Sequence, residues 1–133
     1  MTATYLSKAQ IFERAKRFVK EIFVPAWDGT VKYLPMNMDE RRQIRKECTK
    51  LEVDEKSGDT VQVLDIEMFE ICSLVYCCRD ESGARLLFTR DDIAKLQSEI
   101  AAGGISVVAS AIMKESGITT NVVKRSEATP KEG

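Results

Sequence analysis

The sequence contains no histidine among its 133 residues, and only three prolines and seven glycines. Histidine is the commonest general base, metal ligand and charge switch near neutral pH, so its absence removes the usual equipment of many enzymes. An excess of charge of one sign is missing too, because 20 Lys and Arg stand against 21 Asp and Glu, a formal net charge of −1. Nucleic-acid binders normally carry a basic excess on one face, so this balance argues against a nucleic-acid partner.

Long apolar runs and disulfide patterns are also absent. No stretch approaches the roughly 18 consecutive apolar residues of a membrane span, and residues 1–5 lack the charged and apolar regions of a secretory signal. The four cysteines, Cys48, Cys72, Cys77 and Cys78, show neither a C-x-x-C pair nor the spacing of a disulfide framework. We therefore expect buried free thiols in a reducing cytoplasm, no membrane association, and no metal or cofactor.

What is present is the composition of an ordinary globular protein, with 44% hydrophobic and 31% charged residues. The length suits one domain. We expect that domain to span residues 1–117, followed by a flexible polar tail over residues 118–133. The predicted fold class is mainly α, with about five helices and a small β-hairpin near residues 23–34, so that the chain is α+β only at the margin.

Three helix starts are predicted from capping boxes, in which a polar N-cap residue is followed three positions later by an acidic or amide residue. The pairs are Ser7 with Gln10, Asn37 with Glu40, and Thr89 with Asp92. Apolar residues at helical spacing extend the first helix as far as Ile22. A central buried helix is predicted over residues 65–79, and a last helix over residues 105–116 that ends at Gly117.

The segments between these helices contain turn signals. Pro25 should end the first helix, and Asp28-Gly29 favours a two-residue type I′ turn in the hairpin. Residues 52–60 form a polar loop, while Val61–Leu64 fits either a strand or the start of the central helix. Gly103-Gly104 should stop the fourth helix.

Catalytic chemistry finds little support in these residues. The acidic residues Asp80, Glu81, Asp91 and Asp92 lack the alternating ligands of an EF-hand loop, and caps and turns explain them. No phosphate-binding glycine loop is present, and no nucleophile has a base placed beside it in sequence. We therefore expect a non-enzymatic interaction protein without catalytic, cofactor or metal residues.

Two stretches resemble the tail assembly chaperones of long-tailed bacteriophages, the lambda-like siphophages. The first, residues 23–31, reads Phe-Val-Pro-Ala-Trp-Asp-Gly-Thr-Val and precedes Asp39-Glu40-Arg41; it is similar to that family's Val-Pro-Glu-Trp-Gly-Gly-x-Val segment. The second, residues 75–96, contains an Asp-x-x-Gly turn, Leu-Phe-Thr and an acidic pair in the family's order. Ala26 stands where the family usually has Glu, and Asp28 where it usually has the first Gly.

This resemblance implies a chaperone that binds and solubilises the tape measure protein in the host cell cytoplasm and is absent from the finished virion. It implies a homo-oligomer, and recruitment of the tail tube (major tail) protein mainly through a longer form made by programmed frameshift; this chain looks like the shorter form. Helical faces and the hairpin would form a shallow groove for amphipathic client helices. The candidate protein-binding residues are Trp27, Tyr33, Arg41, Arg42 and Phe88. The alternative is a small nucleic-acid or regulatory binding module that uses the basic face of helix two, Arg41, Arg42, Arg45 and Lys46.

Overall fold

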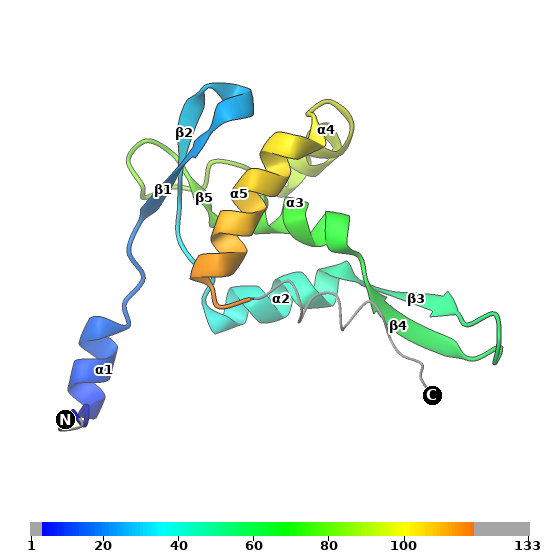
Figure 1. The fold of residues 1–133 in the computed structure, drawn as a ribbon, viewed down its shortest axis with the longest axis horizontal. Helices are drawn as coiled ribbons and strands as arrows, with labels where there is room; N and C mark the ends of the chain where they lie inside the picture. Colours follow the sequence, from blue (N-terminus) through cyan, green and yellow to red (C-terminus); the bar gives the residue numbers. More distant parts are fainter. Residues whose placement is uncertain (1–3, 119–133) are drawn as a thin grey trace.

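The computed structural model describes residues 4–118 and shows five α-helices and five β-strands in that range (Figure 1). In chain order the elements are α1 (Lys8–Arg14), β1 (Lys20–Val24), the 3-10 turn η1 (Pro25–Trp27), β2 (Gly29–Tyr33), α2 (Met38–Cys48), β3 (Thr49–Val53), β4 (Thr60–Leu64), α3 (Ile66–Cys77), β5 (Cys78–Arg79), the 3-10 turn η2 (Arg90–Asp92), α4 (Ile93–Ser98) and α5 (Ala102–Glu115). The strands form two small antiparallel sheets, β1-β2-β5 and β3-β4. The expectation of a mainly α chain with one hairpin is therefore wrong, because the described part of the chain is an α+β fold.

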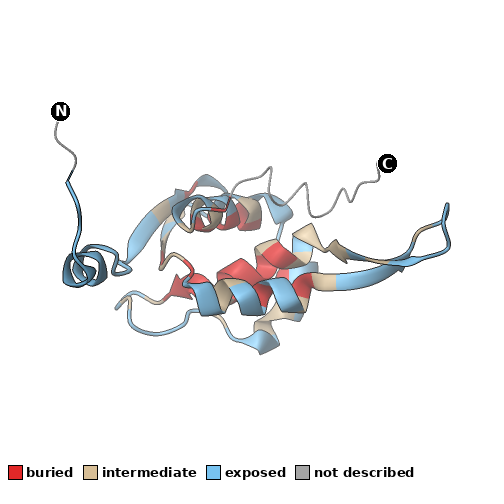
Figure 2. Cartoon of the chain, turned by 90° about the horizontal axis from the view of Figure 1, so that it is seen from below, coloured by how far each residue is buried: buried red, intermediate tan, exposed pale blue. Residues whose placement is uncertain are grey.

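The core is built around α3, which contacts α5 and α2 (Figures 1 and 2). Asp65 caps this helix by accepting a hydrogen bond from the Met68 amide, and most of the residues that follow are buried. Leu74 of α3, Ile44 of α2 and Ile112 of α5 are fully buried members of this core. The prediction of a central buried third helix is confirmed.

The first helix is much shorter than its apolar periodicity predicts. It ends at Arg14, and Lys20–Val24 forms strand β1, in which Ile22 pairs with Val31 of β2. The run Ile22, Phe23 and Val24 consists of β-branched and aromatic residues that fit a pleated strand. Pairing with β2 satisfies their backbone groups and overrides the helical pattern.

The turn between β1 and β2 is also longer than predicted. Val24 pairs with Gly29, so four residues connect the strands, and Pro25, with its fixed φ, opens the 3-10 turn η1. Asp28 alone takes the left-handed conformation there, with φ 48°. The expected two-residue turn at Asp28-Gly29 is therefore wrong, because Gly29 already belongs to β2.

A second hairpin, β3-β4, stands where a long polar loop was expected. The loop is limited to residues 54–59, closed by a bond from the Gly58 amide to the Asp54 carbonyl, and Val61–Leu64 is a strand. Leu51 and Val53 are exposed on this hairpin, which projects from one end of the molecule (Figure 2). The segment was predicted to be a loop because the hairpin projects from the body. Strands with little tertiary burial do not need the alternating apolar and polar residues by which a strand is predicted.

The C-terminal half follows the predicted order with one shift. The capping box of Thr89 and Asp92 is present, but it opens η2 before the short helix α4. Gly103 and Gly104 lie inside α5 rather than stopping a helix, and α5 ends before Gly117, whose φ of +77° is the predicted left-handed cap. Ile118 is buried against the core, and the rest of the predicted tail, residues 119–133, lies outside the described residues.

Candidate functional site

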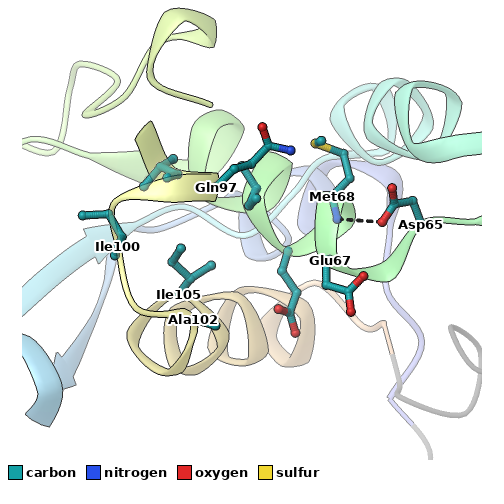
Figure 3. A pocket seen from close by; sticks show the side chains of 10 residues that line it. Asp65, Glu67, Met68, Gln97, Ile100, Ala102 and Ile105 are labelled. Carbon is teal, nitrogen blue, oxygen red and sulfur yellow. Dashed lines mark hydrogen bonds between the residues drawn. The ribbon is translucent and has the colours of Figure 1, made fainter. Parts of the chain in front are cut away.

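A groove opens to solvent where the N-terminal parts of α3 and α5 meet α4 (Figure 3). Its volume is about 370 Å³. Apolar side chains form its floor: Met68, Ile71, Leu96, Ile100, Ala102 and Ile105. We call this feature the α3-α4-α5 groove. Leu96, Ile71 and Ile105 are buried and anchor the floor to the core, whereas Ile100 remains 39% exposed and available for contact.

The rim of the α3-α4-α5 groove is acidic. Asp65, Glu67 and Glu70 line it together with Gln97, and no Lys or Arg does. The Asp65 carboxylate caps α3 through the Met68 amide at 3.1 Å, and Glu70 Oε1 accepts a hydrogen bond of 3.0 Å from the Ser106 hydroxyl. Glu67 is exposed and forms no ion pair within residues 4–118. Its charge is therefore available to a partner.

An apolar floor beside acidic side chains, of which Glu67 is exposed and forms no ion pair among the described residues, fits one face of an amphipathic helix that carries basic residues. Burying apolar surface contributes roughly 25 cal/mol per Å², which supplies the affinity, while the carboxylates select the charge of the partner. The groove is small, with a volume of about 370 Å³ and six apolar lining residues. A single groove should therefore bind weakly, and tight binding requires several copies.

Three elements, α2, α3 and η2, share a cluster of polar hydrogen bonds on another side of the body. Glu47 Oε2 of α2 accepts hydrogen bonds from the Tyr76 hydroxyl at 2.6 Å, from Arg90 Nη1 at 2.9 Å and from Gln43 Nε2 at 2.7 Å. Burial alone would raise the pKa of Glu47, but the hydrogen bonds from Arg90, Tyr76 and Gln43 outweigh it and lower the pKa overall. Burial, together with the hydrogen bond to the Glu47 carboxylate and its charge, raises the pKa of Tyr76, and the nearby Arg90 opposes this only in part. This cluster ties α2 and α3 to η2, and thereby fixes where α4 begins.

The three aromatic residues predicted as binding residues lie in different environments. Tyr33 of β2 is only 4% exposed and belongs to the core. Trp27 is 37% exposed, and its indole lies on Gly104 of α5. Phe88 is half-buried next to Arg90, in a shallow depression shared with Leu86 and Val75. Of the three, Trp27 and Phe88 keep surface that a partner can touch.

The two predicted arginines lie on α2. Arg41 is half-buried, and its Nε is buried without a hydrogen-bond partner, whereas Arg42 is exposed. Arg45 and Lys46 are exposed on the same helix, so a basic strip does exist on α2. The five candidate residues are not gathered in one site, and none of them lines the α3-α4-α5 groove.

The sequence prediction missed the α3-α4-α5 groove because three separate elements build it. One signal was present, the apolar run Ile100, Ala101 and Ala102 before the glycine pair, which extends beyond the single stripe of α4. Because this run was predicted to be the end of the fourth helix, the role of Ile100 and Ala102 as groove lining was missed. Its position between α4 and α5 follows only from the tertiary structure.

Residues 4–118 contain no group of three His, Cys, Asp or Glu side chains that could hold a metal ion, and none of the helices in that range is long and apolar enough to cross a bilayer. No protein-family model, no curated protein and no solved structure matches this chain.

Proposed function

We propose that this chain is a phage tail assembly chaperone, which binds the tape measure protein and keeps it soluble until the tail polymerises around it. The observation that carries the proposal is the α3-α4-α5 groove, whose apolar floor and acidic rim suit one face of an amphipathic client helix. The activity is binding rather than catalysis. It takes place in the host cell cytoplasm, and the chaperone leaves before the virion is complete.

The positions of the two family-like stretches support the proposal. Residues 23–31 form the turn and strands of the β1-β2 hairpin, and residues 75–96 run from the end of α3 through β5 to α4. Although about fifty residues apart in sequence, the two stretches contribute to one sheet, because β2 begins within the first stretch and pairs, through the following residues Lys32 and Tyr33, with β5 in the second. A shared local structure gives both motifs a reason to occur together.

The backbone at Asp28 also agrees with the family pattern. Asp28 has φ 48° and ψ 49°, the left-handed conformation that glycine adopts without strain. The family usually has glycine at this position. Asp is one of the few other residues that adopt this conformation at modest cost, so the departure from the pattern keeps the same turn.

Because the tape measure protein is long, weak binding at each groove suffices for tight binding overall. Several chaperone copies that bind along one tape measure protein give avidity, because each further contact is intramolecular once the first has formed. Recruitment of the tail tube protein would fall mainly to the longer frameshifted form, which carries an extension beyond this sequence. A slippery heptamer in the gene near the codons for residues 129–131 would support that part, and its absence there would contradict it.

The decisive experiment is co-expression of this chain with a tape measure protein, followed by pull-down. Ile100→Asp places a charge in the α3-α4-α5 groove, while Val107→Asp is a matched control, since both side chains are 39% exposed and only Ile100 lines the groove. We expect the wild type and Val107→Asp to solubilise the client and co-purify with it, and Ile100→Asp to lose both effects. A tape measure protein that is equally insoluble with and without the chaperone would contradict the proposal.

A further inference from the structure

We propose that helix α1 of one copy docks in the α3-α4-α5 groove of a second copy, and that a client helix displaces it. The first half of this inference stands on the geometry of the chain, while the second half rests on the proposed function. The groove would then be covered by the protein's own N-terminal helix until a client arrives.

Helix α1 packs against no other element within residues 4–118. It spans seven residues, none of them buried, and both views show it apart from the body (Figures 1 and 2). Phe12 is 70% exposed, and Tyr5, Leu6 and Ile11 are exposed beside it. Isolated helices this short are marginal in water even with a capping box such as that of Ser7 and Gln10. The exposed apolar side chains therefore need a surface to cover them.

The chemistry of α1 complements that of the groove. The helical period places Ile11 and Phe12 on one face, with Lys8 one turn before them and Arg14 at the edge beside Ile11. Neither Lys8 nor Arg14 forms an ion pair within the described range. The groove offers an apolar floor and the exposed Glu67 on its rim. Basic and apolar groups on the helix thus meet acidic and apolar groups in the groove.

The segment that follows α1 is held near the C-terminal end of α5. The groove lies at the other end of α5, so α1 is badly placed to dock in its own copy. Arg17 Nη1 donates to Glu40 Oε1 at 2.8 Å and to the Pro35 carbonyl at 3.1 Å, and Lys20 Nζ lies 3.9 Å from Glu115 Oε1 at the last turn of α5. The groove lies at the first turn of α5, about 20 Å away along the helix at 1.5 Å per residue.

The connection between α1 and these anchors cannot bridge that gap. From Arg17 back to Arg14, the last residue of α1, an extended chain reaches at most about 10 Å. Docking within one copy would require breaking the Arg17 bonds and lifting Val19 from Gly83, against which it packs. A second copy can supply its α1 without breaking either contact.

This arrangement is head-to-tail. The donated helix and the accepting groove are different surfaces at opposite parts of the molecule, so each copy can give one helix and accept another. Such heterologous contacts form either closed rings or open chains, and the length of the open chains depends on protein concentration. Because only a few side chains are buried at each contact, a client that offers repeated helices can compete with α1.

The test is sedimentation velocity of the full chain over a wide range of concentration, without a client. Phe12→Asp should weaken self-association at least about tenfold, while Phe23→Asp, also at an exposed phenylalanine but on β1, should leave it unchanged. Lys8→Glu and Glu67→Lys should each weaken association, and the double variant should restore it, which a loss of folding could not mimic. Unchanged association of Phe12→Asp, or failure of the double variant to recover, would overturn the docking.

Measuring whether each variant binds the client distinguishes a failure of α1 docking from a failure of the proposed function. If both hold, Phe12→Asp binds the tape measure protein at least as tightly as the wild type, because its groove is open. If Phe12→Asp is monomeric and no variant binds the client, α1 docking stands and the proposed function fails. If the client binds while Phe12→Asp associates like the wild type, the proposed function stands and α1 docking is overturned. A concentration-independent monomer in which α1 is protected from proteolysis would also overturn docking in a second copy.

Discussion

The indole of Trp27 lies directly against Gly104 of α5. A Cβ atom added at Gly104 would lie 2.5 Å from two ring atoms of that indole, closer than real side chains approach. Gly104 is buried in the first turns of α5, so the ring covers the helix backbone at this point. This contact fastens the turn of the β1-β2 hairpin to the helix that carries one wall of the α3-α4-α5 groove.

The first prediction tests that contact with neighbouring glycines. Gly104→Ala should destabilise the protein by about 1–3 kcal/mol, because the new methyl group must displace the indole. Gly103→Ala, one residue earlier and with open space around its Cβ position, should be neutral or stabilise the helix by up to about 1 kcal/mol. Denaturant unfolding measures both free energies. Equal effects of the two substitutions would show that Trp27 does not lie on the helix as described.

The same glycine shows where sequence reasoning reached its limit. A glycine pair after an apolar stripe is a normal helix stop, and only the tertiary approach of Trp27 explains why Gly104 lies inside α5. The end of α1 at Arg14 has a similar cause, since pairing of Ile22 with Val31 in β2 overrides the helical spacing. Both errors come from contacts between elements distant in sequence.

Local signals were read correctly. The capping boxes that begin at Ser7, Asn37 and Thr89 are all present, because each depends on bonds between residues three positions apart. The buried α3 and the left-handed cap at Gly117 are local too. A groove assembled from α3, α4 and α5 has no such local signature, so the sequence prediction of a groove made by helical faces and the hairpin did not identify it, and no hairpin residue lines it.

The second prediction concerns the left-handed backbone at Asp28. Asp28→Gly should leave stability unchanged or raise it slightly, since glycine adopts φ 48° without strain. Asp28→Ala should cost about 1 kcal/mol, because Ala keeps the Cβ that crowds the following carbonyl but lacks the polar side-chain atoms that let Asp tolerate this conformation. Thermal or urea unfolding of the three proteins gives the order. An Ala variant as stable as the wild type would mean that the turn adopts another conformation in solution.

The third prediction is a pH dependence that originates at Glu47. Its pKa is lowered in the folded protein, so its stabilising contribution is fully present above the ordinary Glu pKa of about 4.3 and is lost as the pH falls through the folded pKa. Glu47→Gln should therefore be destabilised by about 1 kcal/mol at pH 7 and approach the wild type below about pH 4. Urea unfolding at several pH values measures this difference. Glu55→Gln, at an exposed turn residue, should follow the wild-type curve throughout, and a parallel offset for Glu47→Gln at every pH would exclude the charge as the cause.

The fourth prediction concerns the cysteines, all four of which are free and buried in the described chain. Burial raises the pKa of the Cys77 and Cys78 thiols to about 12, so they stay protonated and poorly nucleophilic at pH 8. A thiol reagent at that pH should label the folded protein only as fast as it unfolds, and should label all four thiols at once in denaturant. Rapid modification of Cys77 or Cys78 in the native protein would show that the end of α3 opens without global unfolding, and would contradict this prediction.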